Sequence, residues 1–121
     1  MTKAQKTGAK GEKLALTLLS DKGLAIVETN WRCPQGEIDI VARDAQTLVF
    51  VEVRSRRANS TERAFASVSP LKQEKMIAAA YAYLDAHDLD DSIVWRIDVI
   101  AVAFMLGGKV MIDHVEDALG W

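Results

Sequence analysis

Two carboxylates, Asp39 and Glu52, lie in neighbouring segments of the sequence in which apolar and polar residues alternate. Residues 37–43 and 48–56 have the pattern of β-strands, and only residues 44–47 separate them. So short a connection predicts an antiparallel hairpin. If the turn is symmetric, the numbers of paired residues sum to 91, and Asp39 faces Glu52 across the hairpin.

This register is supported by the apolar face that it creates. It pairs Ala42 with Val49, Ile40 with Val51, and Ile38 with Val53. A shift of one residue would move these side chains to the opposite face, so the pattern itself selects the register. The other face then carries the two acids and, beside them, Glu37 opposite Arg54.

The predicted pair of acids destabilises the hairpin unless something relieves the repulsion. Opposed side chains have Cβ atoms about 4.5–5.5 Å apart, and like charges at that separation are unfavourable. A proton on one carboxylate, a neighbouring Lys or Arg, or a divalent metal ion would each relieve it. Mg²⁺ is bound by one or two carboxylates together with water and phosphate oxygens, which fits this pair. The residues alone leave the basic side chain and the metal ion as open alternatives.

Glu12 is a third acid that could join this pair. It lies at the border of the apolar stripe of the first predicted helix, and Gly8 and Gly11 precede it. Glycine lowers helix stability by about 0.5–1 kcal/mol relative to alanine, and close approach of a backbone or a ligand is one reason for its use. Glu12 either reaches the polar end of the hairpin or is a solvated helix residue.

The elements around the hairpin predict the fold class. A helix is expected from Thr7 or Gly8 to Gly23, and a second from Ser69 to His87, where a serine cap and Pro70 mark the start. Further strands are expected over 25–32, 93–106 and 110–115, with a loop over 57–69. The prediction is one α/β domain over residues 1–121, a sandwich with a central mixed β-sheet of about five strands flanked by helices.

Composition and charge limit the classes of protein to consider. Half of the 121 residues are hydrophobic and 26% are charged, which excludes a disordered chain. The net charge of −2 excludes a histone-like coat of positive charge, but residues 1–13 carry +3 and residues 54–75 carry +4. A single cysteine, Cys33, and the lack of a signal peptide or a membrane-length apolar run predict a cytoplasmic protein without a membrane span.

Five segments of the chain carry a family resemblance. They are GxxGE (Gly8 to Glu12), Asn30-Trp31-Arg32, GEIDIVA (Gly36 to Ala42), LVFVEVRSR (Leu48 to Arg56) and WRIDVI (Trp95 to Ile100). With them the chain resembles the YraN-like family of small uncharacterised bacterial proteins. That family is similar to the PD-(D/E)xK restriction-endonuclease-like superfamily, particularly to archaeal Holliday-junction resolvases. The resemblance implies a restriction-endonuclease-like three-layer sandwich and Mg²⁺- or Mn²⁺-dependent hydrolysis of nucleic-acid phosphodiesters.

The resemblance also implies a role for each candidate residue. Asp39 and Glu52 match the acidic positions that bind the metal ion, and Glu12 matches a glutamate of the first helix. Arg54 falls where the superfamily has a lysine, and because arginine stays charged it cannot act as a general base. It can still hold a water or stabilise the transition state. Lys72 is either a lysine that has migrated to this role or an ordinary charge on the helix surface.

The two basic segments adjoin these residues and are expected to hold the nucleic-acid backbone. The residues are Lys3, Lys6, Lys10 and Lys13 in the first segment, and Arg56, Arg57, Arg63, Lys72 and Lys75 in the second. We expect an endonuclease acting on structured DNA, branched DNA included, and a homodimer is one way in which it would cut two strands. The alternative is a non-catalytic module of the same fold that binds nucleic acid or a protein, for which Arg54 is the argument.

Overall fold

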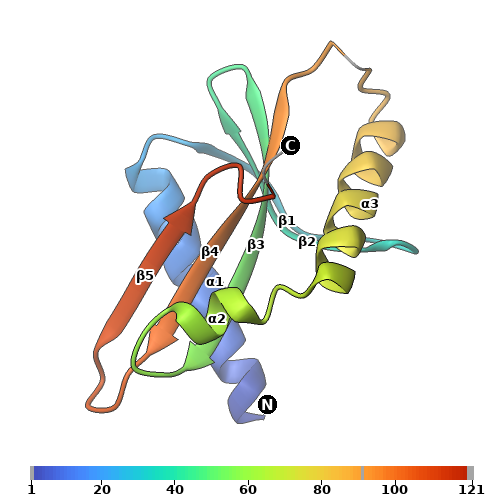
Figure 1. Cartoon of the computed structure of the whole chain (residues 1–121). Helices are drawn as coiled ribbons and strands as arrows, with labels where there is room; N and C mark the ends of the chain where they lie inside the picture. The colour runs from blue at the N-terminus through green and yellow to red at the C-terminus, as the bar shows by residue number, and fades with distance from the viewer. Residues whose placement is uncertain (1, 91, 120–121) are drawn as a thin grey trace.

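The computed structural model describes residues 2–90 and 92–119, and in these ranges it has three helices and five strands (Figure 1). In chain order they are α1 (Lys3–Asp21), β1 (Ala25–Cys33), β2 (Gly36–Asp44), β3 (Thr47–Arg57), α2 (Glu62–Ala66), α3 (Pro70–Ala86), β4 (Trp95–Phe104) and β5 (Val110–Val115). The strands form one mixed sheet with the order β1-β2-β3-β4-β5. Neighbouring strands are antiparallel except for β3 and β4, which are parallel.

The sheet separates two hydrophobic cores, one under each long helix. Ala15 and Leu19 of α1 are buried with Val49 and other strand residues of one face. The other face packs against α3, which buries all five side chains predicted for it: Met76, Ala79, Ala80, Tyr83 and Leu84. The α1–sheet–α3 layering confirms the predicted fold class (Figure 1). In the described part of the chain, no helix combines the length and apolar character needed to cross a membrane.

The predicted hairpin register is confirmed wherever β2 and β3 pair. Pairing runs from Asp44 with Thr47 to Ile40 with Val51, and each pair of numbers sums to 91. The predicted face is wrong for Ile38, which belongs to the core under α3, whereas Ile40 belongs to the core under α1.

A backbone rotation in β1 accounts for the position of Ile38. Asn30, between the residues of β1 that pair with Ile40 and Ile38, has a left-handed φ of 54°. Because of this rotation, Glu28 and Trp31 both reach Tyr83 of α3, although residues three apart in a regular strand face opposite sides. Ile38 of β2 pairs with Trp31 and packs with it in the core under α3.

Three element boundaries differ from the prediction. α1 begins at Lys3 because Thr2 and Gln5 form a capping box about three turns before the apolar stripe starts at Leu14. α2 lies within the segment predicted as a loop, and its five residues are too few to show a helical period. β4 is shorter at both ends than the predicted strand 93–106, and the glycine turn after it begins at Met105, whose N–H donates to the carbonyl of Lys109.

α1 approaches β3 so closely that one helical position has no room for a side chain. A Cβ at Gly11 would lie 1.8 Å from Ser55 Oγ, whereas a Cβ at Gly8 would meet nothing within 4 Å. Ser55 Oγ is buried and has no hydrogen-bond partner within the ranges that the structure describes. The close approach that glycine permits is therefore real at Gly11, and it places the next residue, Glu12, near the sheet.

Candidate active site

Asp39 lies just beyond the last pair of β2 and β3, Ile40 with Val51, so the predicted direct pairing of Asp39 with Glu52 is wrong. The two carboxyls are still close enough for the charge of Glu52 to act on Asp39. Asp39 Oδ2 accepts a hydrogen bond of 2.8 Å from the backbone N–H of Val53. The carboxylate thus takes the place of the backbone carbonyl that would accept this bond in a regular pair of strands. Burial has the largest effect on this carboxyl and raises its pKa, and the negative charge of Glu52 raises it further. The bond from Val53 lowers the pKa, but the net result is a rise from 3.8 to about 7.

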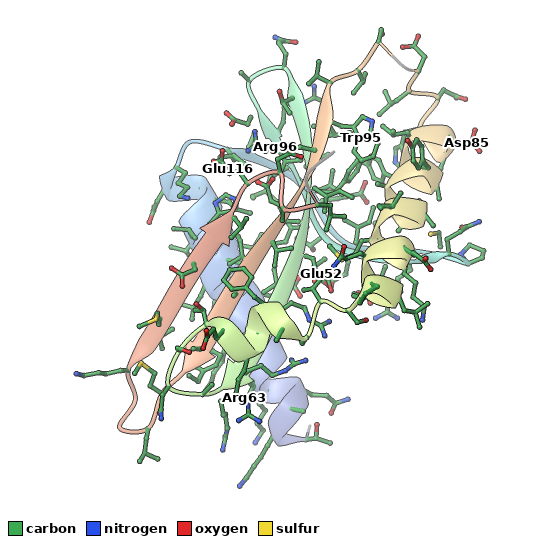
Figure 2. The ribbon with its side chains drawn as sticks, viewed as in Figure 1. Glu52, Arg63, Asp85, Trp95, Arg96 and Glu116 are labelled. Atoms are coloured by element: carbon green, nitrogen blue, oxygen red, sulfur yellow. The ribbon has the colours of Figure 1, made fainter. Side chains whose placement is uncertain are left out.

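Glu52 is only 5% exposed and lies between β3 and α3 (Figure 2). Its Oε1 is 3.1 Å from Lys72 Nζ and 3.3 Å from Arg54 Nη1. Two of the three ways to relieve the repulsion between the carboxylates are therefore present. Cations lie beside Glu52, and the raised pKa keeps a proton on Asp39 up to about neutral pH. Lys72 reaches a buried acid and is not merely a charge on the helix surface.

Arg54 is held in place by the segment between α2 and α3. Its Nε donates to Ser67 Oγ at 2.8 Å and its Nη2 to the Ser67 carbonyl at 3.4 Å. The predicted pairing of Arg54 with Glu37 is wrong, because backbone pairing ends before those residues, and Glu37 instead forms an ion pair with Arg32 at 3.6 Å. Sequence reasoning missed Ser67, since nothing in its neighbourhood marks it as a partner of a residue in β3.

Glu12 approaches the same end of the hairpin from α1. Its Oε1 accepts a hydrogen bond of 2.9 Å from Asn30 Nδ2, and its charge is one of the weaker causes that raise the pKa of Asp39. Asn30 thus both turns the strand and orients Glu12. The sequence contained a signal for this turn, because asparagine adopts the left-handed conformation more readily than most residues.

The acid pair keeps oxygens available for a ligand. Within residues 2–90 and 92–119, Oδ1 of Asp39 and Oε2 of Glu52 accept no hydrogen bond. Hard carboxylate oxygens of this kind suit Mg²⁺ or Mn²⁺. In the same ranges, no group of three or more His, Cys, Asp or Glu side chains is already gathered around a metal position.

A groove rich in cations, which a second hollow connects to Arg54, lies on the surface. We call it the basic groove; its volume is about 860 Å³, and its charged residues are Lys3, Lys6, Lys10, Arg57, Arg63 and Glu62. It joins the N-terminal half of α1 to the end of β3 and to α2, and Figure 2 shows Arg63 where α2 approaches α1. The two basic segments of the sequence, far apart along the chain, therefore meet at one surface.

The other predicted backbone-binding residues lie around the basic groove or away from it. Arg56 and Arg57 line a second hollow of about 490 Å³, which also contains Arg54 and Lys3. Burial lowers the pKa of Arg56, and the neighbouring charges of Arg54 and Arg63 lower it further. Lys13 and Lys75 are exposed and line neither hollow.

A separate polar cluster fills the junction of β4, β5 and the end of α1. Asp98 is fully buried and accepts hydrogen bonds from Arg96 Nε at 3.0 Å, His114 Nε2 at 2.8 Å and the Asp117 N–H at 3.0 Å. Burial acts to raise the pKa of Asp98, but these bonds outweigh it and hold the pKa below its usual range. His114 Nδ1 is 2.8 Å from Lys22 Nζ, so the cluster ties α1 to the sheet.

The sequence of the chain matches a described family. The model of "Uncharacterised protein family UPF0102" matches residues 11–102. The chain belongs to this family. Expected membership of a small uncharacterised bacterial family is thus confirmed, and the UPF0102 match includes Glu12, Asp39, Glu52 and Arg54 but begins after Lys10.

Relatives with the UPF0102 name are similar over nearly the full length. A UPF0102 protein of Chloroflexus aurantiacus (strain J-10-fl) is 44% identical over 119 residues, which cover 98% of this chain and 97% of the relative. One of Ralstonia pickettii is 48% identical over 118 residues, or 94% and 90% of the two chains. Among solved structures, SfsA of Pyrococcus furiosus in complex with Ca²⁺ is 15% identical with a TM-score of 0.39, over 93% of this chain and 63% of that one.

Proposed function

We propose that this UPF0102 protein is a metal-dependent nuclease that hydrolyses phosphodiester bonds of structured DNA, with Mg²⁺ or Mn²⁺ held by Asp39 and Glu52. The observation that carries this proposal is the acid pair, in which Glu52 is buried and Asp39 partly buried, together with the hollow at Arg54 that joins the pair to the basic groove. A protein that only binds nucleic acid gains nothing from buried carboxylates beside its binding surface, because they repel phosphate. A hydrolase gains a metal site there.

The donor atoms fit such a metal ion. When bound, a divalent cation would supply a water of lowered pKa and a positive charge facing the phosphate. Asp39 must lose its proton before it can act as a ligand, so the affinity for the metal should rise with pH up to about 7. Glu52 would offer Oε2 while Oε1 stays with its cations.

The other residues around the pair have distinct roles in this proposal. Lys72 has a flexible ammonium group beside Glu52 and can orient the attacking water, the task of the lysine that Arg54 replaces. Arg54 is fixed by Ser67 and provides a permanent charge for the transition state. Glu12, held by Asn30, faces the same end of the hairpin and can accept a hydrogen bond from water.

Metal binding is the first test. Calorimetric titration with Mn²⁺ and Mg²⁺ should give a single site that is lost in Asp39→Ala and kept in Glu74→Gln, a change of an exposed carboxylate of α3. The measurement is repeated with branched DNA present, because phosphate oxygens complete many magnesium sites. No binding at millimolar metal, with or without DNA, would rule out the proposal.

Cleavage of labelled branched and linear DNA is the second test. Asp39→Ala and Glu52→Gln should each lower the rate by more than about 100-fold, since a metal ligand supplies several kcal/mol to the transition state. Arg54→Lys should raise the rate if the arginine is a handicap. Cleavage that survives in Glu52→Gln would show that the site lies elsewhere.

A non-catalytic module of the same fold is the second candidate. The observation in its favour is that Lys72 and Arg54 already neutralise Glu52 without a metal ion. It predicts DNA binding that is insensitive to Asp39→Ala and to EDTA, with no cleavage at any metal concentration. The two tests above separate it from the nuclease.

A further inference from the structure

The basic groove has two walls of different chemistry. Lys3, Lys6 and Lys10 are spaced three and four residues apart, so they lie on one side of α1 and form one wall. Phe104, at the end of β4, and Leu106, in the turn that follows, contribute to the lining as well. Figure 1 shows the first turns of α1, α2 and the β4–β5 turn at the same end of the molecule.

The cations of the groove outnumber its acids, since Glu62 is the one acidic residue in the lining that the structure describes. None of the salt bridges in the described part of the chain involves Lys3, Lys6, Lys10, Arg57 or Arg63. Holding several like charges around one hollow is unfavourable unless an anion occupies it. Their arrangement along a groove rather than around a point favours a polyanion.

The apolar residues narrow the choice of polyanion. Leu106 is 96% exposed, and together with Phe104 it gives the groove an apolar side next to the cations. A single nucleic-acid strand has both phosphates for the lysines and unstacked base faces for an apolar wall. A duplex has its base faces stacked inside and offers only phosphates and groove edges to a protein.

The groove also leads to the acid pair. The second hollow shares Lys3, Thr7 and Arg57 with the basic groove and reaches Arg54, whose Nη1 contacts Glu52. A single nucleic-acid strand that lies along both hollows would therefore pass close to the candidate catalytic carboxylates. The volume of about 860 Å³ is of the size that binds small ligands, which corresponds to a short stretch of strand rather than a whole duplex.

We propose that the basic groove binds a single-stranded segment of nucleic acid, with its phosphates on α1 and its bases against Leu106 and Phe104. The inference rests on the proposed nuclease function and adds a substrate class to it. The substrate would be a nucleic acid with a single-stranded part next to the bond that is cut. DNA and RNA strands have the same phosphates and base faces, so the chemistry is shared by both.

Fluorescence anisotropy in EDTA tests the inference without catalysis. The probes are a labelled mixed-sequence DNA strand, the same strand in RNA, and the DNA duplex of equal length. We expect the DNA strand, the RNA strand or both to bind at least about tenfold more tightly than the duplex, since stacking of a base on an aromatic side chain, here Phe104, is worth about 1–3 kcal/mol. Duplex binding as tight as that of both strands would overturn the proposal.

Three variants locate the binding. Leu106→Ser should weaken strand binding about tenfold and leave duplex binding unchanged, whereas Lys6→Glu should weaken both and reduce the salt dependence. Val27→Ser, at a half-exposed valine of β1, is the matched control and should change neither. Unchanged strand binding in Leu106→Ser, with a native circular dichroism spectrum, would refute the role of the apolar wall.

The outcome is separable from that of the nuclease proposal. Strand binding is measured without metal and should persist in Asp39→Asn, which lacks the proposed metal ligand. If calorimetry finds no metal site while the groove still prefers single strands, the proposed function fails and the inference about the groove holds. If metal binds and cleavage occurs but strands show no preference, the inference fails and the proposed function holds.

Discussion

Replacing Asp39 with asparagine should stabilise the protein at alkaline pH. The pKa of Asp39 is raised from 3.8 to about 7 in the folded protein. As pH rises above 3.8, the unfolded chain loses this proton while the folded protein keeps it, so folding stability falls until pH passes about 7. Asparagine has no charge to bury, and its side-chain oxygen can still accept the hydrogen bond from Val53.

The size of the effect follows from the same shift. Each pH unit between the two pKa values changes the free energy of unfolding by about 1.4 kcal/mol per proton. Between pH 5 and pH 8 the parent crosses two units of that interval, so its stability should fall by about 3 kcal/mol relative to Asp39→Asn. Over the whole interval from pH 3.8 upward the difference should be on the order of 4 kcal/mol.

Urea denaturation of both proteins at pH 5 and pH 8 measures this quantity. Titrating groups that do not interact with Asp39 cancel, so the difference between the two pH-dependences reports on Asp39 and the carboxylates that interact with it. Glu74→Gln, an exposed carboxylate on α3, should follow the parent. If the free energies of unfolding of Asp39→Asn and the parent change equally with pH, within about 1 kcal/mol, the pKa of Asp39 is not raised in the folded protein.

Three further predictions concern stability at pH 7. Gly11→Ala should destabilise by about 1–3 kcal/mol because its Cβ would collide with Ser55, whereas Gly8→Ala should be neutral or stabilising; equal melting temperatures for the two would contradict the close contact. Asp98→Ala should lower the free energy of unfolding in urea by about 3–5 kcal/mol, since it leaves buried hydrogen-bond donors without their acceptor. A loss under about 1 kcal/mol would be inconsistent with that network. Lys72→Met should cost about 1.5–3 kcal/mol by leaving a buried carboxylate with one cation fewer, and an unchanged urea midpoint would argue against the contact.

The parts of the fold that sequence predicts well are those governed by local periodicity. Alternating apolar residues fixed the hairpin register because a one-residue slip reverses every side chain, and helical spacing identified the buried face of α3. The first turns of α1 carry lysines instead of an apolar stripe, so only the cap at Thr2 marks their start. Ile38 changed faces because of a rotation in another strand, at Asn30, which the pattern of β2 cannot reveal.

The candidate site divides in the same way. Asp39 and Glu52 could be predicted from the sequence, because both lie in one hairpin and two like charges so close together are unfavourable unless they have a function. Their relation to Lys72 and Ser67 depends on how the α2–α3 connection crosses the sheet, which is a tertiary event without a local signal. The network around Asp98 joins residues of α1, β4 and β5 and was likewise invisible from spacing.

The parallel pairing of β3 with β4 sets the order in which the candidate site assembles during folding. β1, β2 and β3 are joined by tight turns, and contacts that are local in sequence close early. β4 follows β3 only after the long connection between Arg57 and Trp95, and closing so long a connection is slower. Lys72 lies within this connection, so we expect Asp39 and Glu52 to come together before Lys72 docks beside them. The nascent hairpin has to tolerate both carboxylates without a cation, so alkaline pH should slow the folding rate of this protein more than it speeds unfolding.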